Sequence, residues 1–340
     1  MAQQLDHVSD SRYCTNNNAG RDIHSHYYDS EMGPTSLLPT SLSFNDAPID
    51  LLSSHFTGRE EELDRIETVL GVVRGSTPTR FTVYGMPGIG KTQLALQYGV
   101  SSFDRQRYSV IFWISGATVE KLNQGFAKVL ALVGHPDRDH PDQSIRLTSA
   151  RRWLEESDGN GHIKWLLILD NVAQEAVSFL REHLPRKNSI GNILLTTRTE
   201  GTAEAVAAVA GQQHHVFKLP VPSMQDAANL LLHEAGIDPG DAITSSTSNA
   251  QALAKCVGCL PLAISHVASF SKQSHQNLDG VLRLYQSKHK FEVCLLQILF
   301  RKRAYSLATC KVNQLGQQSI ELRTEVHRGH VCRSTRRVGS

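Results

Sequence analysis

Strand-like and helix-like hydrophobic patterns alternate along most of the chain. From Arg80 onward, short runs of β-branched and aromatic residues alternate with segments in which apolar residues recur every three or four positions. The run Trp165–Leu169 is almost wholly apolar, as expected of a central parallel strand covered on both faces. This alternation predicts right-handed crossovers and an α/β fold with a doubly wound parallel sheet. The predicted strands are Arg80–Tyr84, Val110–Ile114, Trp165–Leu169, Asn192–Thr197 and an edge strand near Val216–Leu219; the predicted helices are Glu60–Leu70, Lys91–Tyr98, Val119–Val133, Gln143–Glu156, Ala173–Leu184 and Ala203–Val209.

Only helical periodicity continues after Leu219. Ser223 and Asp226 have the spacing of a capping box at the start of a helix. Pro261 suits the first position of another helix, because proline has no N–H to leave unpaired there. A small all-helical unit is therefore predicted, with helices near Met224–Ala235, Gln251–Val257, after Pro261 and near Val281–Lys288.

These patterns divide the chain into four parts. Residues 1–52 are polar and rich in serine and proline, and we expect a disordered N-terminal arm there, with order beginning near His55. The α/β domain covers 53–219 and the helical unit covers 220–290. Residues 291–340 form a basic tail to which no fold is assigned.

Composition excludes several classes of protein. A formal net charge of +2 gives no argument for a nucleic-acid partner. No apolar run reaches the ~20 residues that span a bilayer, and the N-terminus lacks a secretory signal pattern. We therefore expect a cytoplasmic protein that binds neither membranes nor nucleic acids.

A phosphate-binding loop is the strongest chemical signal. The pattern G-x-x-x-x-G-K-[ST] is met between a predicted strand and a predicted helix, and its glycines let backbone N–H groups approach phosphate oxygens. Lys91 should reach the β- and γ-phosphates, and the Thr92 hydroxyl should bind Mg²⁺. We place Gln93 with the nucleotide-binding residues as well. The loop itself is Gly85, Met86, Pro87, Gly88, Ile89, Gly90, Lys91 and Thr92, which predicts a P-loop nucleotide-binding domain over 53–219.

Two later strands end in charged residues. Asp170 follows the apolar strand Trp165–Leu169, where it can hold Mg²⁺ or a water bound to it. Arg198 follows Thr196 and Thr197 on the phosphate side of the predicted sheet. From the residues alone, Arg198 could sense a γ-phosphate or could point into solvent.

Five sequence blocks follow one another along the chain: Phe56-Thr57-Gly58-Arg59-Glu60, the P-loop, Leu166-Leu167-Ile168-Leu169-Asp170-Asn171, Thr196-Thr197-Arg198 and Gly258-Cys259-Leu260-Pro261-Leu262-Ala263. In this order they resemble the NB-ARC domain of STAND-type P-loop NTPases, the switch domain of NLR immune receptors and apoptotic protease-activating factors. The segment around Phe112-Trp113-Ile114 is most similar to fungal NB-ARC proteins that often carry tetratricopeptide repeats. The resemblance covers about residues 53–288.

The resemblance implies roles for particular residues. Gly58 and Arg59 would lie beside the adenine, Arg198 would contact the γ-phosphate, and Pro261 would pack near the base and ribose. It also implies an ATP/ADP switch in immune or cell-death signalling, in which ADP holds the helical unit closed and ATP exposes a surface for homo-oligomerisation. The chain has no N/T-K-x-D motif for guanine, which favours ATP over GTP.

Two departures from the family pattern affect the expected activity. Many members carry a second acid where this chain has Asn171, and an amide cannot act as a general base, so we expect a slow ATPase at most. A winged-helix latch is not recognisable after Lys290. Two alternatives therefore remain open: a non-signalling nucleotide-binding remnant, and a turnover ATPase or small-molecule kinase. The upstream ligand, the effector and the oligomer size have no signature in the sequence.

Overall fold

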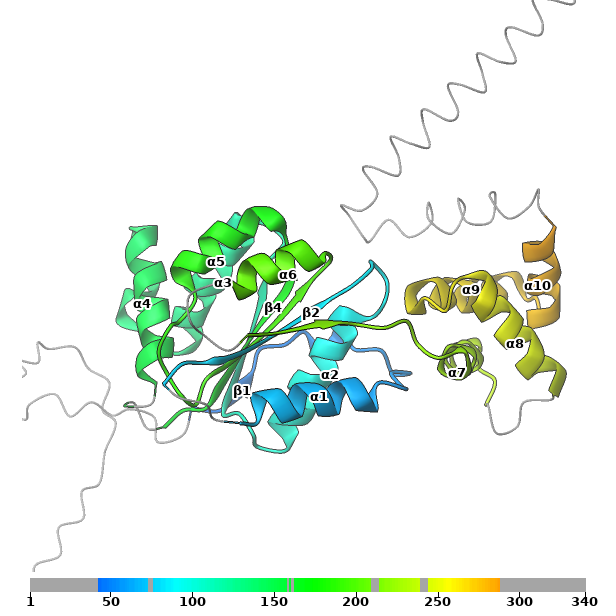
Figure 1. Ribbon diagram of the computed structural model, residues 1–340, viewed down its shortest axis with the longest axis horizontal. Coiled ribbons are helices and arrows are strands. Elements are labelled where there is room, and N and C mark those ends of the chain that lie inside the picture. The colour runs from blue at the N-terminus through cyan, green and yellow to red at the C-terminus, as the bar shows by residue number, and fades with distance from the viewer. Residues whose placement is uncertain are drawn as a thin grey trace, which may run out of the picture. The chain divides into compact units, whose positions relative to one another are not determined.

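A six-stranded parallel sheet is the centre of the structure (Figure 1). The computed structural model describes residues 42–72, 76–157, 159, 162–208, 214–238 and 244–287, and all of these fall within one unit of the chain. The strand order is β1-β3-β4-β5-β2-β6, which confirms the predicted α/β fold class. The strands are β1 (Phe44–Asn45), β2 (Thr79–Tyr84), β3 (Val110–Ser115), β4 (Trp165–Val172), β5 (Asn192–Thr197) and β6 (His214–Lys218).

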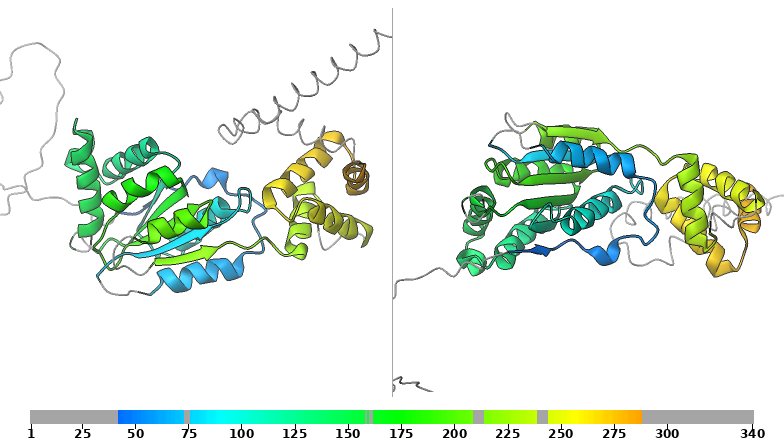
Figure 2. Two further views of the ribbon diagram at one scale, coloured as in Figure 1. Left: turned by 45° about the horizontal axis from the view of Figure 1, so that its top comes forward. Right: turned by 90° about the horizontal axis from the view of Figure 1, so that it is seen from below.

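Helices cover both faces of the sheet, as Figure 2 shows. Helices α1 and α2 pack on one face, and α3, α4, α5 and α6 pack on the other. Three short 3₁₀ segments, η1, η2 and η3, lie in the connections. The bounds are α1 (Glu60–Leu70), α2 (Lys91–Asp104), α3 (Val119–Leu132), α4 (Gln143–Glu156), α5 (Val177–His183), α6 (Glu200–Ala207), η1 (Ile49–Leu51), η2 (Pro136–Asp139) and η3 (Gln174–Ala176).

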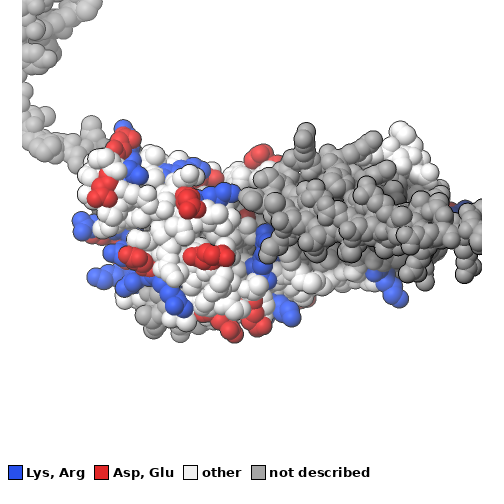
Figure 3. Space-filling view, turned by 90° about the horizontal axis from the view of Figure 1, so that it is seen from above, with Lys and Arg blue, Asp and Glu red and all other residues white. Residues whose placement is uncertain are grey.

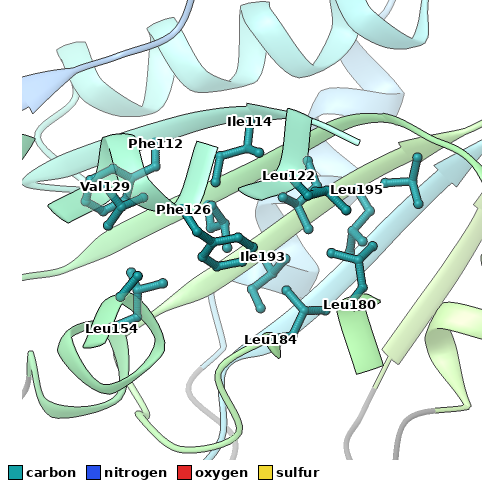
Figure 4. Packing of buried hydrophobic residues seen from close by; sticks show 14 of the residues in the cluster. Phe112, Ile114, Leu122, Phe126, Val129, Leu154, Leu180, Leu184, Ile193 and Leu195 are labelled. Carbon is teal, nitrogen blue, oxygen red and sulfur yellow. The ribbon is translucent and has the colours of Figure 1, made fainter. Parts of the chain in front are cut away.

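Strand side chains alternate between two hydrophobic cores because successive residues point to opposite faces of a sheet. Phe112 on β3, which Figure 4 shows, and Leu167 on β4 enter the core under α3, α4 and α5. Their neighbours Ile111 and Leu166 enter the core under α1 and α2. Both cores are fully buried, so an almost wholly apolar strand such as β4 is stable only at this central position.

The helical unit has a core of its own. Ser223 caps its first helix, since its Oγ accepts from the Asp226 N–H at 3.1 Å. Helix α9 begins at Pro261, as predicted. Leu231, Leu253 and Val267 are fully buried between the helices. These helices are α7 (Met224–Ala235), α8 (Thr244–Cys256), α9 (Pro261–Ser274) and α10 (Leu278–Gln286).

Several predicted elements have the bounds that the structure gives, including α1, α4, β5 and α7. The prediction of a disordered arm is wrong for residues 42–52, because β1 pairs with β3 there and η1 follows. The predicted helix Ala173–Leu184 is interrupted, and comprises η3 followed by α5. Helix α6 begins at Glu200 rather than Ala203, because Thr199 caps it by accepting from the Thr202 N–H. The rest of the predicted arm, the helix ends at Val209 and Lys288, and the tail 291–340 lie outside the described residues.

On the face that Figure 3 shows, acidic and basic side chains lie among one another over the described residues. Among the described residues, no helix is both long enough and apolar enough to cross a membrane.

Polar side chains lie on the neighbouring strands β2 and β6. Arg80 on β2 is fully buried and donates from Nη2 to the Pro185 carbonyl at 2.9 Å. His214 on β6 has its Nε2 2.6 Å from the Thr82 Oγ1. Within the described part of the chain, Arg80 Nε and Nη1 and His214 Nδ1 are buried without a hydrogen-bond partner. Burial, then the nearby Arg80 and His215, lower the pKa of His214 from 6.5 to about 3.

This lowered pKa predicts a loss of stability in acid that His214 causes. Between pH 6.5 and about 3 the unfolded chain binds a proton that the folded chain does not, so the free energy of unfolding falls as the pH falls. We expect His214→Gln to reduce the acid destabilisation measured between pH 7 and pH 5 by about 1–2 kcal/mol. Urea unfolding at both pH values measures this, with His215→Gln as the matched control. Equal pH dependence in wild type and His214→Gln would contradict the prediction.

Candidate functional site

Three strands end together at one edge of the sheet and bring the predicted residues to one place. Strand β5 lies between β2 and β4, and Thr197 is in register with Tyr84 on one side and with Val172 on the other. In a parallel sheet all carboxyl ends point the same way, and ligands bind at that edge. Asp170 lies near the carboxyl end of β4, Lys91 follows β2 at the start of α2, and Arg198 directly follows β5.

The loop Gly85–Thr92 has the backbone of an anion cradle. Gly88 and Gly90 have φ angles of 81° and 101°, a left-handed region that strains any residue with a Cβ. A Cβ built on Gly90 would meet no atom within 4 Å, so conformation rather than crowding requires glycine there. Gly90 is also the N-cap of α2, whose first backbone N–H groups and dipole favour an anion.

Lys91 is a nearly buried cation held by backbone carbonyls. Its Nζ donates to the Gly85 carbonyl at 2.7 Å and to the Met86 carbonyl at 2.9 Å. Burial, and after it the nearby Arg198, lower the pKa of Lys91 from 10.5 to about 8, against an opposing effect of Asp170. No carboxylate pairs directly with Lys91 among the described residues. A desolvated ammonium without an acidic partner fits a site for a phosphate group.

Two hydroxyl groups hold the Asp170 carboxylate. The hydroxyls of Thr92 and Thr196 donate to its Oδ1 at 2.9 and 2.7 Å. Burial raises the pKa of Asp170 above its ordinary value, against the opposing effects of these hydrogen bonds and of Lys91. A desolvated carboxylate next to a hydroxyl is suited to a hard cation such as Mg²⁺, so the predicted pair of Thr92 and Asp170 could hold one.

Thr196 has a role that the sequence reasoning missed. It is buried, donates to Asp170, and accepts the Asn171 backbone N–H at 2.8 Å. The sequence feature that could have indicated this role is its position in the block Thr196-Thr197-Arg198, where a role was predicted for Arg198 alone. Arg198 itself is exposed, and its Nε donates to the Asn171 Oδ1 at 3.2 Å.

Arg59 and Gln93 use their side chains to join segments around the loop. The buried Arg59 guanidinium donates to the Ile89 carbonyl at 3.2 Å and to the Pro220 carbonyl at 3.0 Å, and it pairs with Glu62. Gln93 donates to the Leu51 carbonyl and accepts the Ser53 N–H, both at 2.8 Å. These contacts position the loop. Direct contacts of Arg59 and Gln93 with a nucleotide stay predictions.

The helical unit reaches the loop through the start of α9. The Leu262 N–H donates to the Gly88 carbonyl at 3.2 Å, and a Cβ on Gly88 would come within 3.0 Å of the Leu262 Cβ. Gly58, with a φ of 71°, lies against Asp226 of α7. The predicted residues Gly58 and Pro261 are therefore placed where the α/β layer and the helical unit meet, and their contact with a base stays a prediction.

The sheet, the glycine loop and the aspartate at the end of β4 define a nucleotide-binding domain of the P-loop NTPase class. The model of the NB-ARC domain matches residues 59–235, which is half of the chain. The chain belongs to the NB-ARC family, as its five sequence blocks predict.

One curated relative is a "Nucleotide-binding leucine-rich repeat (NLR)-like protein" of the fungus Hyaloscypha variabilis, 26% identical over 290 residues. The match covers 79% of this chain and spans 27% of that protein. Among solved structures, Cdc6p from Pyrobaculum aerophilum aligns with 16% identity and a TM-score of 0.48, over 66% of this chain and 65% of that one. The Aeropyrum pernix ORC2 protein aligns with 14% identity and a TM-score of 0.48, over 69% of each chain.

Removal of the Thr196 hydroxyl should weaken the site and the fold together. We expect Thr196→Val to lower the free energy of unfolding by about 1–3 kcal/mol, because the Asn171 N–H and the Asp170 carboxylate each lose a partner. Urea unfolding measures the loss. Thr196→Ser keeps the hydroxyl and should retain most of the stability. If Thr196→Val is as stable as Thr196→Ser, the two hydrogen bonds do not contribute as described.

Proposed function

We propose that this chain is an ATP/ADP-dependent molecular switch of the NB-ARC type that acts in signal transduction in the cytoplasm. The observation that carries the proposal is the convergence of Lys91, Asp170 and Arg198 at the carboxyl edge of one parallel sheet. A cation that faces backbone carbonyls, a hydroxyl-held carboxylate and a second, exposed cation match the parts of a magnesium-bound nucleoside triphosphate.

Each residue has a distinct part in this proposal. The P-loop N–H groups and Lys91 bind the β-phosphate, which ATP and ADP share. Thr92 and Asp170 hold Mg²⁺, which when bound neutralises charge on the phosphate oxygens. Arg198 reads the γ-phosphate, which only ATP carries.

A nucleotide can shift a conformational equilibrium only if it binds the two states unequally. The proposal supplies two contacts that differ between states. One is Arg198 with the γ-phosphate. The other is the start of α9 against the P-loop, where Leu262 donates to Gly88. Arg59 adds a link from the P-loop to Pro220, in the segment between the sheet and the helical unit.

Slow hydrolysis suits a switch. Asn171 follows Asp170, and an amide cannot accept a proton as a general base. The proposal extends to a nucleotide-dependent homo-oligomer and to NLR-like immune or cell-death signalling, which the fungal NLR-like relative supports. Rapid turnover of ATP by the purified chain would instead favour an ATPase, and binding without any ATP–ADP difference would favour a non-signalling remnant.

One prediction of the proposed function concerns the phosphates that ATP and ADP share. We expect Lys91→Ala to weaken both ATP and ADP by roughly ten- to hundredfold, because a charge-assisted hydrogen bond to phosphate is lost. Calorimetric titration with each nucleotide and Mg²⁺ measures this, after any co-purified nucleotide has been identified and removed. Lys187→Ala, an exposed lysine away from the loop, is the matched control. Unchanged affinity in folded Lys91→Ala would refute the P-loop assignment.

Another prediction of the proposed function concerns the difference in affinity between ATP and ADP. Arg198→Ala should weaken binding of the β,γ-imido analogue of ATP by about tenfold and leave ADP affinity within about twofold, because ADP lacks the phosphate that Arg198 reads. The same titration tests it. Arg152→Ala, which removes an exposed arginine from α4, should change neither affinity. Equal losses for both nucleotides would remove the sensor role.

A further inference from the structure

Asn171 occupies a backbone position that few residues tolerate. Its φ is 57°, in the left-handed region where asparagine and glycine are the favoured residues. The ladder between β4 and β5 is irregular between Leu169 and Val172, so Asn171 sits outside the regular pairing. Its N–H is nevertheless fixed, since it donates to the buried Thr196 hydroxyl at 2.8 Å. The side chain therefore starts from a defined point beside Asp170.

From that point the Asn171 amide reaches Arg198. Its Oδ1 accepts from the Arg198 Nε at 3.2 Å. Among the described residues, the Arg198 Nη1 and Nη2 atoms take part in no hydrogen bond or ion pair. The Nε of Arg198 is thus held by Asn171, and Nη1 and Nη2 are available to donate hydrogen bonds to a phosphate.

We propose that Asn171 is a positioning residue for Arg198 in this chain: its neutral amide holds Nε and leaves the charge of the guanidinium for the γ-phosphate, which distinguishes ATP from ADP. The inference rests on the proposed function, because it needs Arg198 to read the γ-phosphate. Asn171 stands where many family members carry a second acid, and the inference gives it a role in nucleotide binding that is separate from hydrolysis.

The choice of amide over carboxylate follows from the strength of the two pairings. A neutral amide oxygen holds Nε by an ordinary hydrogen bond and does not neutralise the guanidinium. A carboxylate would form a charge-assisted and potentially bidentate pair with it. Asp at this position would then compete with the γ-phosphate for Arg198. It would also add a negative charge near every nucleotide, and this second effect does not depend on Arg198.

Asn171→Gly and Asn171→Asp separate these effects. Glycine keeps the left-handed backbone without strain and removes only the amide. Aspartate keeps the size and adds the charge. Each is combined with Arg198→Ala, and wild type, the three single variants and the two double variants are titrated with ADP and with the β,γ-imido analogue of ATP, in Mg²⁺. The analogue excludes hydrolysis, which an added acid could promote.

We expect Asn171→Gly to weaken the ATP analogue by about three- to tenfold, with ADP affinity within about twofold. We expect Asn171→Asp to weaken the analogue more than Asn171→Gly does. In the Arg198→Ala background, Asn171→Gly should have no further effect. Asn171→Asp should there weaken ADP and the analogue by the same factor, since only general repulsion is left.

Four outcomes would overturn the inference. The first is an equal loss for ADP and the analogue in Asn171→Gly. The second is a selective loss that persists in the Arg198→Ala background, since the amide would then act without the arginine. The third is wild-type behaviour of both Asn171 variants while Arg198→Ala is selective for the analogue, which leaves the proposed function intact. If Arg198→Ala itself is not selective, the sensor role fails and this inference fails with it.

Discussion

Strand β5 hydrogen-bonds to β2 on one side and to β4 on the other, and the site depends on this double pairing. It sets strands β2 and β4 two strand spacings apart, roughly 10 Å, with the end of β5 between them. Thr196 and Arg198, at the end of β5, can therefore reach residues of β4. Thr196 contacts Asp170 and Arg198 contacts Asn171. A P-loop strand paired directly with β4 would leave no place for either.

The site holds a cation and an anion, Lys91 and Asp170, and burial disfavours the charged form of each. Burial lowers the pKa of Lys91 and raises the pKa of Asp170, so each group is pushed toward its neutral form. Their mutual attraction opposes both shifts without cancelling them. Phosphate oxygens next to Lys91 and a divalent cation next to Asp170 would stabilise the two charged forms together. A magnesium-bound nucleotide brings both, which gives a physical reason for a single ligand of that class.

The sequence predicted the strands, the helices and the phosphate-binding loop better than the order of the strands in the sheet. Hydrophobic periodicity and composition predicted the strands and helices, and the glycines of the loop predicted the phosphate-binding backbone. The strand order rests on pairs such as Tyr84 with Thr197, which are far apart in the chain and leave no local pattern. Strand β1 has two residues, too few to show a period, and so it was included in the predicted arm. Arg59 joins its segments by donating to the Ile89 and Pro220 carbonyls. Every residue has a backbone carbonyl, so the sequence does not indicate which ones accept.

The link between the P-loop and the helical unit is made by backbone atoms, which limits how substitutions can affect it. Pro261 has no N–H, so the Leu262 N–H is the first donor that α9 offers, and it meets the Gly88 carbonyl. Gly88 needs glycine both for its φ of 81° and for the close approach of Leu262. The family's proline and glycine therefore act through geometry rather than through side-chain chemistry. This hydrogen bond is the contact through which the proposed switch would couple the loop to α9.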